Sequence, residues 1–544
     1  MSNRTRADVL LIAGFCAFLF FYGAGSFGLI GADEPRYAQV AREMLDRHDW
    51  ITPTLGGHAW LEKPPLYYWQ AMLAYSVLGV DDFAARVPSA VDATLLVVAV
   101  YLFFRRFRRG VEVDAALITA SCAGVIGYAR AASMDMALTA AFGIGMLSWW
   151  AWRESESEAG RETEKRIYLA SFYLCMALGM LAKGPIAPFL AGIVILLFAA
   201  VAREWRALAK TLWLPGIVLF CVIALPWYVA VQLRNPQFFR EFFLLHNLAR
   251  FSSNLYHHPE PFWYFLPVTA LALLPWVVFG ATALVSVARA WWKERTTGEA
   301  DLEMQFNMFA ACWLAVPVVF FSLSRSKLPG YILPAVPAGA VLLADYLRRE
   351  MNEGSVSGWL AVLHALVAAA PMVPALLIAY VVTEHRLPAG RPMLTALAVA
   401  FVLCAGIALT LVSRSGLKYL RFVTLIPVVL AVAFVLRFGV KPLDQSLSAR
   451  PLALELANVE TQRLPLAVYG VGRELEYGLA FYRNQAIARY EAGNVPADEH
   501  LVIAPSDWQI ANDRILAGRH VTLLGHDAAQ NVDYYWVGAA GAKN

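Results

Sequence analysis

Two aspartates lie where apolar runs meet polar segments, and each carboxylate could take part in catalysis. Asp33 follows the first apolar run, and Asp135 lies just inside the start of a later one. A carboxylate at a membrane boundary is costly to desolvate, so such residues are usually kept for function. Each has a structural alternative: Asp33 before Pro35 fits a helix N-cap, and Asp135 could form an ion pair with Arg130. We take both aspartates as candidate catalytic acids.

Four cations lie near the predicted outer ends of apolar runs. Lys63 is held beside Pro64 and Pro65, a rigid setting that suits phosphate binding at the membrane surface. Cations at outer ends run against the usual topological bias, and an anionic lipid phosphate would explain them. We predict that Lys63 binds a lipid phosphate with the help of Arg36, Arg86 and Lys183.

Aromatic and charged side chains from the same outer segments are expected to line a substrate cavity. Tyrosine is common at the headgroup level of any membrane protein, so the rings alone are weak evidence. Their place in the sequence beside the candidate acids and cations favours a shared cavity. The expected lining residues are Glu34, Tyr37, Tyr67, Tyr68, Lys327 and Tyr331.

A carboxylate and two histidines offer a metal site that would tie two outer loops together. Glu62, His257 and His258 are ligand types that a divalent metal such as zinc accepts. Their spacing is not that of a known zinc motif, so surface histidines are the alternative, and the chemistry requires no cofactor. The sequence has no phosphate-binding glycine loop, and we expect neither a nucleotide nor a nucleic acid as partner.

The elements that position these residues are membrane-spanning helices. The chain has 544 residues, of which 59% are hydrophobic and 16% charged, whereas soluble proteins carry about 25% charged residues. Apolar runs near the length of a membrane helix recur along it. The sequence predicts an all-α polytopic membrane protein of about thirteen spans, near 8–30, 83–104, 111–128, 132–152, 167–182, 184–203, 211–232, 262–288, 306–322, 331–348, 358–382, 393–413 and 419–437.

The distribution of Lys and Arg predicts the orientation of these spans. Every second connection is basic, namely 105–109, 153–166, 203–210, 289–295, 348–349 and 414–421. Basic connections stay in the cytoplasm, so the N-terminus is expected inside and the chain after Arg437 outside. Two long outer loops, about 31–82 and 234–261, contain amphipathic stretches at 35–47, 65–77 and 238–250 that predict helices on the membrane surface.

The last hundred residues have the composition of a small soluble unit. Short strand-like runs near 466–471, 486–490, 501–504, 521–524 and 534–537 alternate with helical stretches near 451–459 and 474–481. This alternation predicts a compact α/β domain. We therefore divide the chain into a transmembrane catalytic domain, 1–437, and an outer α/β domain, 438–544.

The order of these motifs resembles that of the GT-C glycosyltransferases, which are polytopic enzymes that use lipid-phosphate sugar donors. More closely, it is similar to that of the bacterial lipid A aminoarabinose transferases (ArnT), relatives of the protein O-mannosyltransferases. The resemblance covers residues 1 to about 437 and, less clearly, the C-terminal unit. The segments that carry it are Asp33–Met44, Glu62–Trp69, Ala182–Pro185, His258–Tyr264 and Ser326–Pro334.

This resemblance implies a function in lipopolysaccharide modification at the bacterial inner membrane. It implies transfer of 4-amino-4-deoxy-L-arabinose from undecaprenyl phosphate to lipid A phosphates at the periplasmic face, which confers polymyxin resistance. The family's catalytic acids carry over onto Asp33 and Asp135, and its lipid-phosphate cation onto Lys63. The chain departs from the expected pattern at Gly330, where a hydroxyl residue is expected before Tyr331.

Two alternatives remain on sequence grounds. The first is another GT-C enzyme that uses a different polyprenyl-phosphate sugar or a protein acceptor. The second is a lipid or solute transporter, but transporters usually keep their charged sites near the bilayer midplane within repeated halves. Here the candidate acids gather at one predicted face and no repeat is visible, so a glycosyltransferase is favoured.

Overall fold

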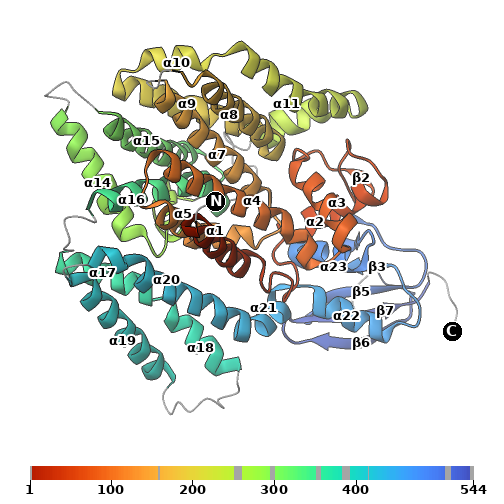
Figure 1. Cartoon of the computed structure of the whole chain (residues 1–544). Helices are drawn as coiled ribbons and strands as arrows, with labels where there is room; N and C mark the ends of the chain where they lie inside the picture. Colours follow the sequence, from red (N-terminus) through yellow and green to blue (C-terminus); the bar gives the residue numbers. More distant parts are fainter. Residues whose placement is uncertain are drawn as a thin grey trace.

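The computed structural model describes residues 3–156, 160–249, 260–294, 301–350, 357–382, 392–413, 416–508, 516 and 518–539. A large helical bundle forms most of the molecule, and a small sheet with its own helices lies at one end (Figure 1). Helices α2 (Asp33–Asp46) and α3 (Leu66–Leu78) lie between the bundle and the sheet. The chain is therefore mostly helical, as the sequence predicts.

The bundle is built from apolar helices and a few irregular turns. In its first half these are α1 (Asn3–Cys16), η1 (Ala17–Phe21), α4 (Asp82–Phe107), α5 (Glu112–Ser121), α6 (Ala123–Ala129), α7 (Met134–Ser155), α8 (Glu162–Lys183), α9 (Ile186–Ala202), α10 (Trp205–Thr211) and α11 (Leu214–Arg234). In the second half they are η2 (Phe239–Ala249), α13 (Phe265–Ala272), α14 (Val277–Glu294), α15 (Leu302–Leu323), η3 (Pro329–Ala335), α16 (Val336–Glu350), α17 (Gly358–Ala369), α18 (Met372–Val382), α19 (Pro392–Val412), α20 (Gly416–Phe434), η4 (Val435–Gly439) and α21 (Val440–Leu447).

Among the described residues, eight helices are long and apolar enough to cross a membrane, or up to ten if each of two bent pairs counts as one span. The predicted span at 262–288 is one of these pairs, because α13 and α14 meet at an angle of 114° around Pro275. Proline has no N–H to continue the helical ladder. The predicted span at 8–30 ends its helix early, since the chain turns at Gly23, whose φ is +68°. The polytopic character is confirmed, and the number thirteen stays a prediction.

The predicted outer loop at 31–82 folds into a layer, called the outer layer below, that covers one end of the bundle. Helices α2 and α3 form where the amphipathic pattern predicts them, and a short hairpin of β1 (Thr54–Leu55) and β2 (His58–Ala59) joins them. The buried face of this layer includes Tyr37, Tyr67 and Tyr68, which pack against the start of α4 and against Phe481. The layer thereby holds the candidate site against the bundle.

The C-terminal unit contains a five-stranded sheet of order β4-β3-β5-β7-β6. Its elements are α22 (Arg450–Val459), β3 (Leu466–Val468), α23 (Arg473–Arg483), β4 (Ala488–Arg489), η5 (Tyr490–Ala492), β5 (His500–Pro505), β6 (Val521–Asp527) and β7 (Val532–Val537). Strand β3 pairs in parallel with β4 and β5, and β7 pairs antiparallel with β5 and β6. All five predicted strands are present. The domain boundary at 437–438 stays a prediction, because an apolar helical segment runs from Lys418 to Leu447 across it.

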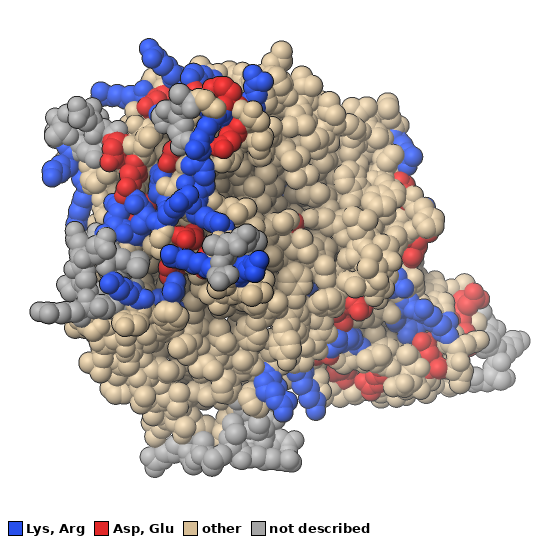
Figure 2. Space-filling view, in the orientation of Figure 1, with Lys and Arg blue, Asp and Glu red and all other residues tan. Residues whose placement is uncertain are grey.

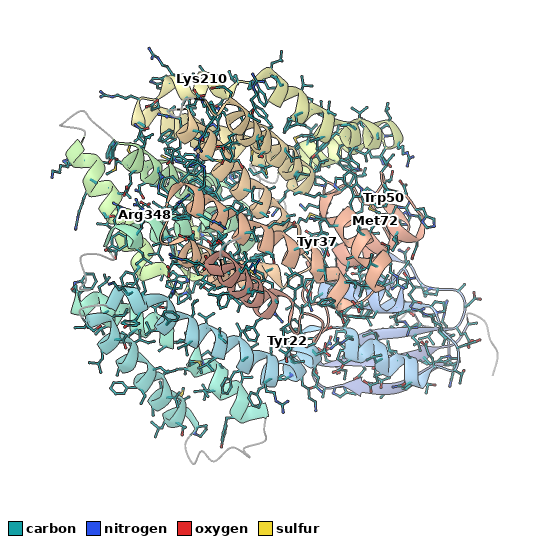
Figure 3. The ribbon with its side chains drawn as sticks, in the orientation of Figure 1. Tyr22, Tyr37, Trp50, Met72, Lys210 and Arg348 are labelled. Carbon is teal, nitrogen blue, oxygen red and sulfur yellow. The ribbon has the colours of Figure 1, made fainter. Side chains whose placement is uncertain are left out.

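The charged side chains gather at two ends of the molecule. Figure 2 shows many Lys and Arg side chains over the end formed by α10, α14 and α16, and mixed charges over the C-terminal sheet. A wide uncharged surface separates the two ends, as expected of a protein surrounded by lipid. Figure 3 places Lys210 and Arg348 at the basic end and Tyr37 toward the other.

Candidate active site

Asp135 is fixed at the beginning of α7 by its own helix cap. Ser133 is the N-cap residue, and its Oγ accepts a hydrogen bond of 3.1 Å from the Asp135 amide while donating one of 2.9 Å to Asp135 Oδ2. The other carboxylate oxygen, Oδ1, accepts a hydrogen bond from Lys183 Nζ. The side chains of Lys183 and Asp135 are 16% and 18% exposed. A mostly buried ion pair therefore joins the start of α7 to the end of α8.

The structural alternative for Asp135, an ion pair with Arg130, is not observed. Arg130 instead donates to the carbonyl oxygens of Leu19 and Tyr22, both at 3.0 Å. Arg130 therefore holds the first helical segment against α6 and leaves Asp135 to Lys183.

Gly330 and Tyr331 lie directly beside this ion pair. The Lys183 ammonium lies 4.9 Å from the centre of the Tyr331 ring, a cation–π contact. A Cβ atom built at Gly330 would lie 2.9 Å from Asp135 Oδ1 and 2.7 Å from the Tyr128 hydroxyl. The departure at position 330 thus has a steric reason, because glycine lets η3 approach the carboxylate directly.

Asp33 lies in the first turn of α2 and pairs with Arg36. The N-cap of this helix is Ala32, so Asp33 does not have the capping role that was its structural alternative. Arg36 donates to Asp33 Oδ1 and to the Tyr37 hydroxyl, the latter at 3.4 Å. The Asp33 side chain is 57% exposed whereas that of Arg36 is 12% exposed. Asp33 is therefore accessible to a ligand, and its partner is held in place.

Three rings surround the Arg36 guanidinium. They belong to Tyr37, Trp60 and Tyr477, at 5.1, 5.1 and 5.7 Å from the guanidinium carbon. Tyr477 lies on α23, so the C-terminal unit reaches the site directly (Figure 1). Sequence reasoning missed Trp60 and Tyr477 because only tertiary packing brings them to α2.

Tyr37 connects the two candidate acids. Burial raises the pKa of its phenol above the ordinary range, and the charges of Asp33 and Asp135 raise it further, against the effect of Arg36. Both carboxylates therefore lie within electrostatic range of one hydroxyl. Figure 3 shows Tyr37 where the surface helices meet the bundle.

Tyr67 and Tyr68 complete an edge-to-face cluster with Tyr37, with ring centres 6.1 to 6.4 Å apart. The Tyr67 hydroxyl donates to the Ala85 carbonyl at 2.9 Å. The Tyr68 hydroxyl is buried and has no hydrogen-bond partner within the described structure. A buried polar group without a partner is unusual and is consistent with a place for a ligand atom.

Lys63 and Glu62 lie near the charged residues of the site. Lys63 is half-buried and within electrostatic range of Asp135. Burial lowers the pKa of Arg36, but the charges of Tyr37, Asp33 and Glu62 outweigh burial and raise this pKa above its ordinary value. The segment 62–63 therefore belongs to the same group of charges as the two aspartates.

Glu34 and Arg86 form a buried support behind the site. Arg86 is completely buried, and it donates to Glu34 Oε2 at 2.6 Å and to the carbonyls of Ala24, Phe27 and Gly28 at 2.7 to 2.8 Å. The other Glu34 oxygen accepts from the Ala132 amide at 3.1 Å. The pair thus fixes the start of α2 to the segment that carries Asp135. It lies apart from the exposed carboxylate of Asp33.

Lys327 joins two connections of the chain, and two of the three predicted metal ligands lie outside the described residues. Lys327 is buried and donates to the carbonyls of Ser324 at 2.5 Å and Glu260 at 3.1 Å, so it ties two connections together. His257 and His258 lie outside the described residues. Within the described parts of the chain, no group of three or more His, Cys, Asp and Glu side chains could hold a metal ion. The metal site stays a prediction.

The site is an arrangement of opposite charges that can hold a phosphate and a cationic group side by side. Lys183, Lys63 and Arg36 supply positive charge, and Asp135 and Asp33 supply negative charge. Phosphate can compete with these carboxylates for the cations, since both are anionic acceptors of charge-assisted hydrogen bonds. Such an arrangement suits group transfer from a phosphate leaving group.

Comparison with known proteins supports this interpretation. Residues 8–241 match the family model described as dolichyl-phosphate-mannose-protein mannosyltransferase. The chain is 32% identical over 359 residues to an undecaprenyl phosphate-alpha-4-amino-4-deoxy-L-arabinose arabinosyl transferase of Pseudomonas aeruginosa, covering 65% of this chain and 62% of that protein. It is also 32% identical over 383 residues to arabinosyl transferase 2 of Pseudomonas fluorescens, covering 69% and 66%. The matched region thus spans less than two thirds of these relatives' own length.

Solved structures show the same fold. ArnT from Cupriavidus metallidurans bound to undecaprenyl phosphate superposes with a TM-score of 0.76 at 23% identity, over 97% of each chain. The apo form of the Archaeoglobus fulgidus oligosaccharyltransferase superposes with a TM-score of 0.52 at 13% identity, over 92% of this chain and 69% of that one. The predicted resemblance is confirmed: the chain is similar in sequence to the undecaprenyl phosphate aminoarabinose transferases and has the ArnT fold.

Proposed function

We propose that this chain is a glycosyltransferase that moves 4-amino-4-deoxy-L-arabinose from undecaprenyl phosphate to phosphate groups of lipid A. The observation that carries the proposal is the group of charges around Tyr37, in which the pairs Asp33–Arg36 and Asp135–Lys183 face one phenol. The names of the Pseudomonas relatives support the aminoarabinose donor, and the ArnT structure with undecaprenyl phosphate supports the lipid carrier.

The active site lies at the periplasmic face of the inner membrane in this proposal. The thirteen predicted spans put the basic connections inside and both the loop 31–82 and the unit 438–544 outside. The separation of Lys210 and Arg348 from Tyr37 in Figure 3 supports this orientation. The outer leaflet there supplies both the polyprenyl donor and lipid A.

The cations bind the phosphate of the donor. Lys63, Lys183 and Arg36 neutralise the charge that develops on the phosphate as the bond to the sugar breaks. Lys183 and Arg36 are already held by carboxylates, so they are positioned before the donor arrives. Arg86 acts through Glu34 in this scheme, because it is buried behind α2 and keeps the segment of Asp33 in place.

The carboxylates have different tasks. The acceptor is itself a phosphate, whose second pKa near 6 leaves it largely ionised, so it needs little help from a general base. Asp33 is exposed and binds the ammonium group of the sugar, whereas the more buried Asp135 holds Lys183 beside Tyr331. In-line attack by the acceptor oxygen on the anomeric carbon, with departure of undecaprenyl phosphate, inverts that centre.

The experiment that tests this function is mass analysis of lipid A from cells that express the chain and supply the donor. We expect a gain of one aminopentose per modified phosphate and increased survival in polymyxin, because the added ammonium offsets the negative charge of the phosphate. Unmodified lipid A in cells with verified donor and expressed protein would exclude this function.

A second candidate is an enzyme of the same superfamily with another sugar or a protein acceptor. The match of residues 8–241 to the protein mannosyltransferase model favours it. The same assay separates the two functions, since this candidate adds a hexose to lipid A or leaves lipid A unchanged and modifies a protein.

A further inference from the structure

A cavity of about 610 Å³ lies between the outer layer and the C-terminal unit, apart from the charges around Tyr37. The outer layer contributes the side chain of Arg42 on α2 and the turn from Val80 to Asp82. The C-terminal unit contributes residues from α22, from the segment after it and from the end of α23. The cavity therefore lies where two parts of the molecule that are distant in sequence come together.

Most charges in this cavity are already neutralised by specific partners. Asp82 accepts hydrogen bonds from Arg450 at 2.9 Å and from the Tyr482 hydroxyl at 2.5 Å. Glu460 accepts two hydrogen bonds from Arg483, at 2.8 and 3.0 Å. These pairs hold the C-terminal unit together and against the bundle, and they leave little charge free for a ligand.

Two further arginines in the lining, Arg42 and Arg463, are less completely neutralised. Arg463 is exposed and has no hydrogen bond or ion pair within the described residues. Arg42 donates to the Phe481 carbonyl at 3.2 Å, and its Nε forms a long ion pair of 4.0 Å with Asp46 but has no hydrogen-bond partner within the described residues. Burial lowers the pKa of Arg42, the charges of Asp46 and Tyr75 raise it, and the charge of Arg463 lowers it slightly. Two incompletely neutralised arginines thus line one cavity.

An anion between them would offset their positive charge and accept hydrogen bonds from the donors that remain. A phosphate is the best match, because its oxygens accept hydrogen bonds from two guanidinium groups at once. A carboxylate has fewer oxygens to share between two such groups.

The surroundings of the cavity indicate that this phosphate belongs to a lipid. Leu454 lines the cavity and is 62% exposed. On α3, just before Val80, three apolar side chains point outward: Leu73 is 58%, Val77 81% and Leu78 49% exposed. The apolar helix α4 begins at Asp82, so the cavity opens where a candidate span starts. A lipid could place its chains along α3 and its headgroup in the cavity.

We propose that the cavity between α2 and α22–α23 is a binding site for the phosphate headgroup of an anionic lipid, held by Arg42 and Arg463. A lipid in this site bridges the outer layer and the C-terminal unit, because one arginine comes from each. Its chains then hold both parts at the membrane surface. The site is separate from sugar transfer, and its test does not depend on that activity.

The test counts bound lipids on the purified full chain by native mass spectrometry, with phosphatidic acid as the probe and diacylglycerol as the phosphate-free control. The wild type should retain one more phosphatidic acid than the Arg42→Gln/Arg463→Gln double variant, and the same number of diacylglycerols. An arginine near a membrane surface contributes about 1 kcal/mol, so Arg463→Gln alone should weaken binding of this lipid about fivefold. Arg473→Gln removes an exposed arginine of the same unit outside the cavity and should bind like the wild type.

Stability measurements guard against a folding defect. Without lipid, Arg463→Gln should melt at the temperature of the wild type, because Arg463 is exposed and forms no hydrogen bond or ion pair with the described residues. Equal phosphatidic acid counts in the wild type and the double variant would overturn the proposal. So would equal protection of the wild type by inorganic phosphate at the same concentration, since the site would then bind free phosphate.

Discussion

The ammonium of Lys183 donates to Asp135 Oδ1, so the last residue of α8 and the first turn of α7 neutralise each other at the end of the bundle. Ser133 holds the second oxygen of the carboxylate, and Tyr331 lies beside the ammonium. The pair positions a cation where a phosphate can reach it, and it leaves neither charge alone when the site is empty.

Replacement of Asp135 tests this pair. Asp135→Asn should reduce sugar transfer by at least 100-fold, because Lys183 loses the charge that positions it. Lys183→Ala should cause a similar loss, and the double variant should lose less than the product of the two effects, since the residues act as a unit. Initial rates in proteoliposomes with matched protein amounts provide the measurement. Independent, multiplicative effects would contradict a functional pair.

Asp33 is expected to act on the substrate and not on the fold. Asp33→Asn should abolish most transfer and leave the melting temperature unchanged, because the side chain is exposed and does not cap α2. Asp46→Asn, at the other end of the same helix and similarly exposed, serves as the control and should keep near-normal activity. A loss of melting temperature with Asp33→Asn would instead indicate a structural role.

Arg86 should be important for stability. Arg86→Met leaves Glu34 buried without its partner, and breaking a buried ion pair costs about 3–5 kcal/mol. We expect a clearly lower unfolding temperature in detergent, measured by intrinsic fluorescence. Glu162→Gln removes a carboxylate that is 71% exposed and pairs with Lys165, and it should leave that temperature nearly unchanged. If Arg86→Met is as stable as the wild type, Arg86 has no structural role, and its predicted role as a phosphate ligand is favoured again.

Gly330 is predicted to be required for the shape of the site. Gly330→Ser places a Cβ within 2.9 Å of Asp135 Oδ1, so the carboxylate must move and the ion pair must weaken. Transfer should fall by about tenfold or more, since small misplacements near reacting groups are costly. Gly127→Ala, on the neighbouring α6 where a Cβ meets nothing within 4 Å, should be active. Normal transfer by Gly330→Ser would show that the carboxylate tolerates displacement.

His500 should make the C-terminal unit sensitive to acid. Burial lowers the pKa of this histidine, which also contacts the Tyr490 hydroxyl. The unfolded chain therefore takes up a proton at a higher pH than the folded chain, and stability falls as pH drops below about 6.5. In the wild type, the exchange rate of the β5 amides, divided by their intrinsic rate at each pH, should rise between pH 7 and pH 5. In His500→Gln the rise of this ratio should be smaller. If the variant shows the same pH dependence as the wild type, protonation of His500 is not the cause of the acid sensitivity.

The sequence predicts the polytopic helical fold, the two surface helices and the five C-terminal strands because hydrophobic periodicity reports local burial. It does not predict the bend around Pro275 or the early end of the first helical segment, since an apolar run looks the same whether it is straight or bent. The two aspartates are recognisable in the sequence because a carboxylate beside an apolar run is costly to desolvate and is usually kept for function.

The partners of these residues depend on tertiary structure. Lys183 was expected to bind phosphate, but its contact with Asp135 joins two helices and has no local signal. The sequence predicts Arg36 as a phosphate-binding cation. Its contact with Tyr477 is not predictable, because it depends on the packing of α23 against α2. Ser133, two residues before Asp135, is the one missed site residue with a readable signal, because serine before an apolar helix is a common N-cap.

The most direct test of the proposed function uses the purified chain in liposomes with undecaprenyl phosphate-linked 4-amino-4-deoxy-L-arabinose and lipid A. Product analysis by mass and by the configuration of the new glycosidic bond should show one aminopentose per modified phosphate, with inversion. The same measurement on Asp33→Asn and Asp135→Asn should show almost no product. Transfer at the wild-type rate by both variants, with both proteins folded, would contradict the assignment of this site.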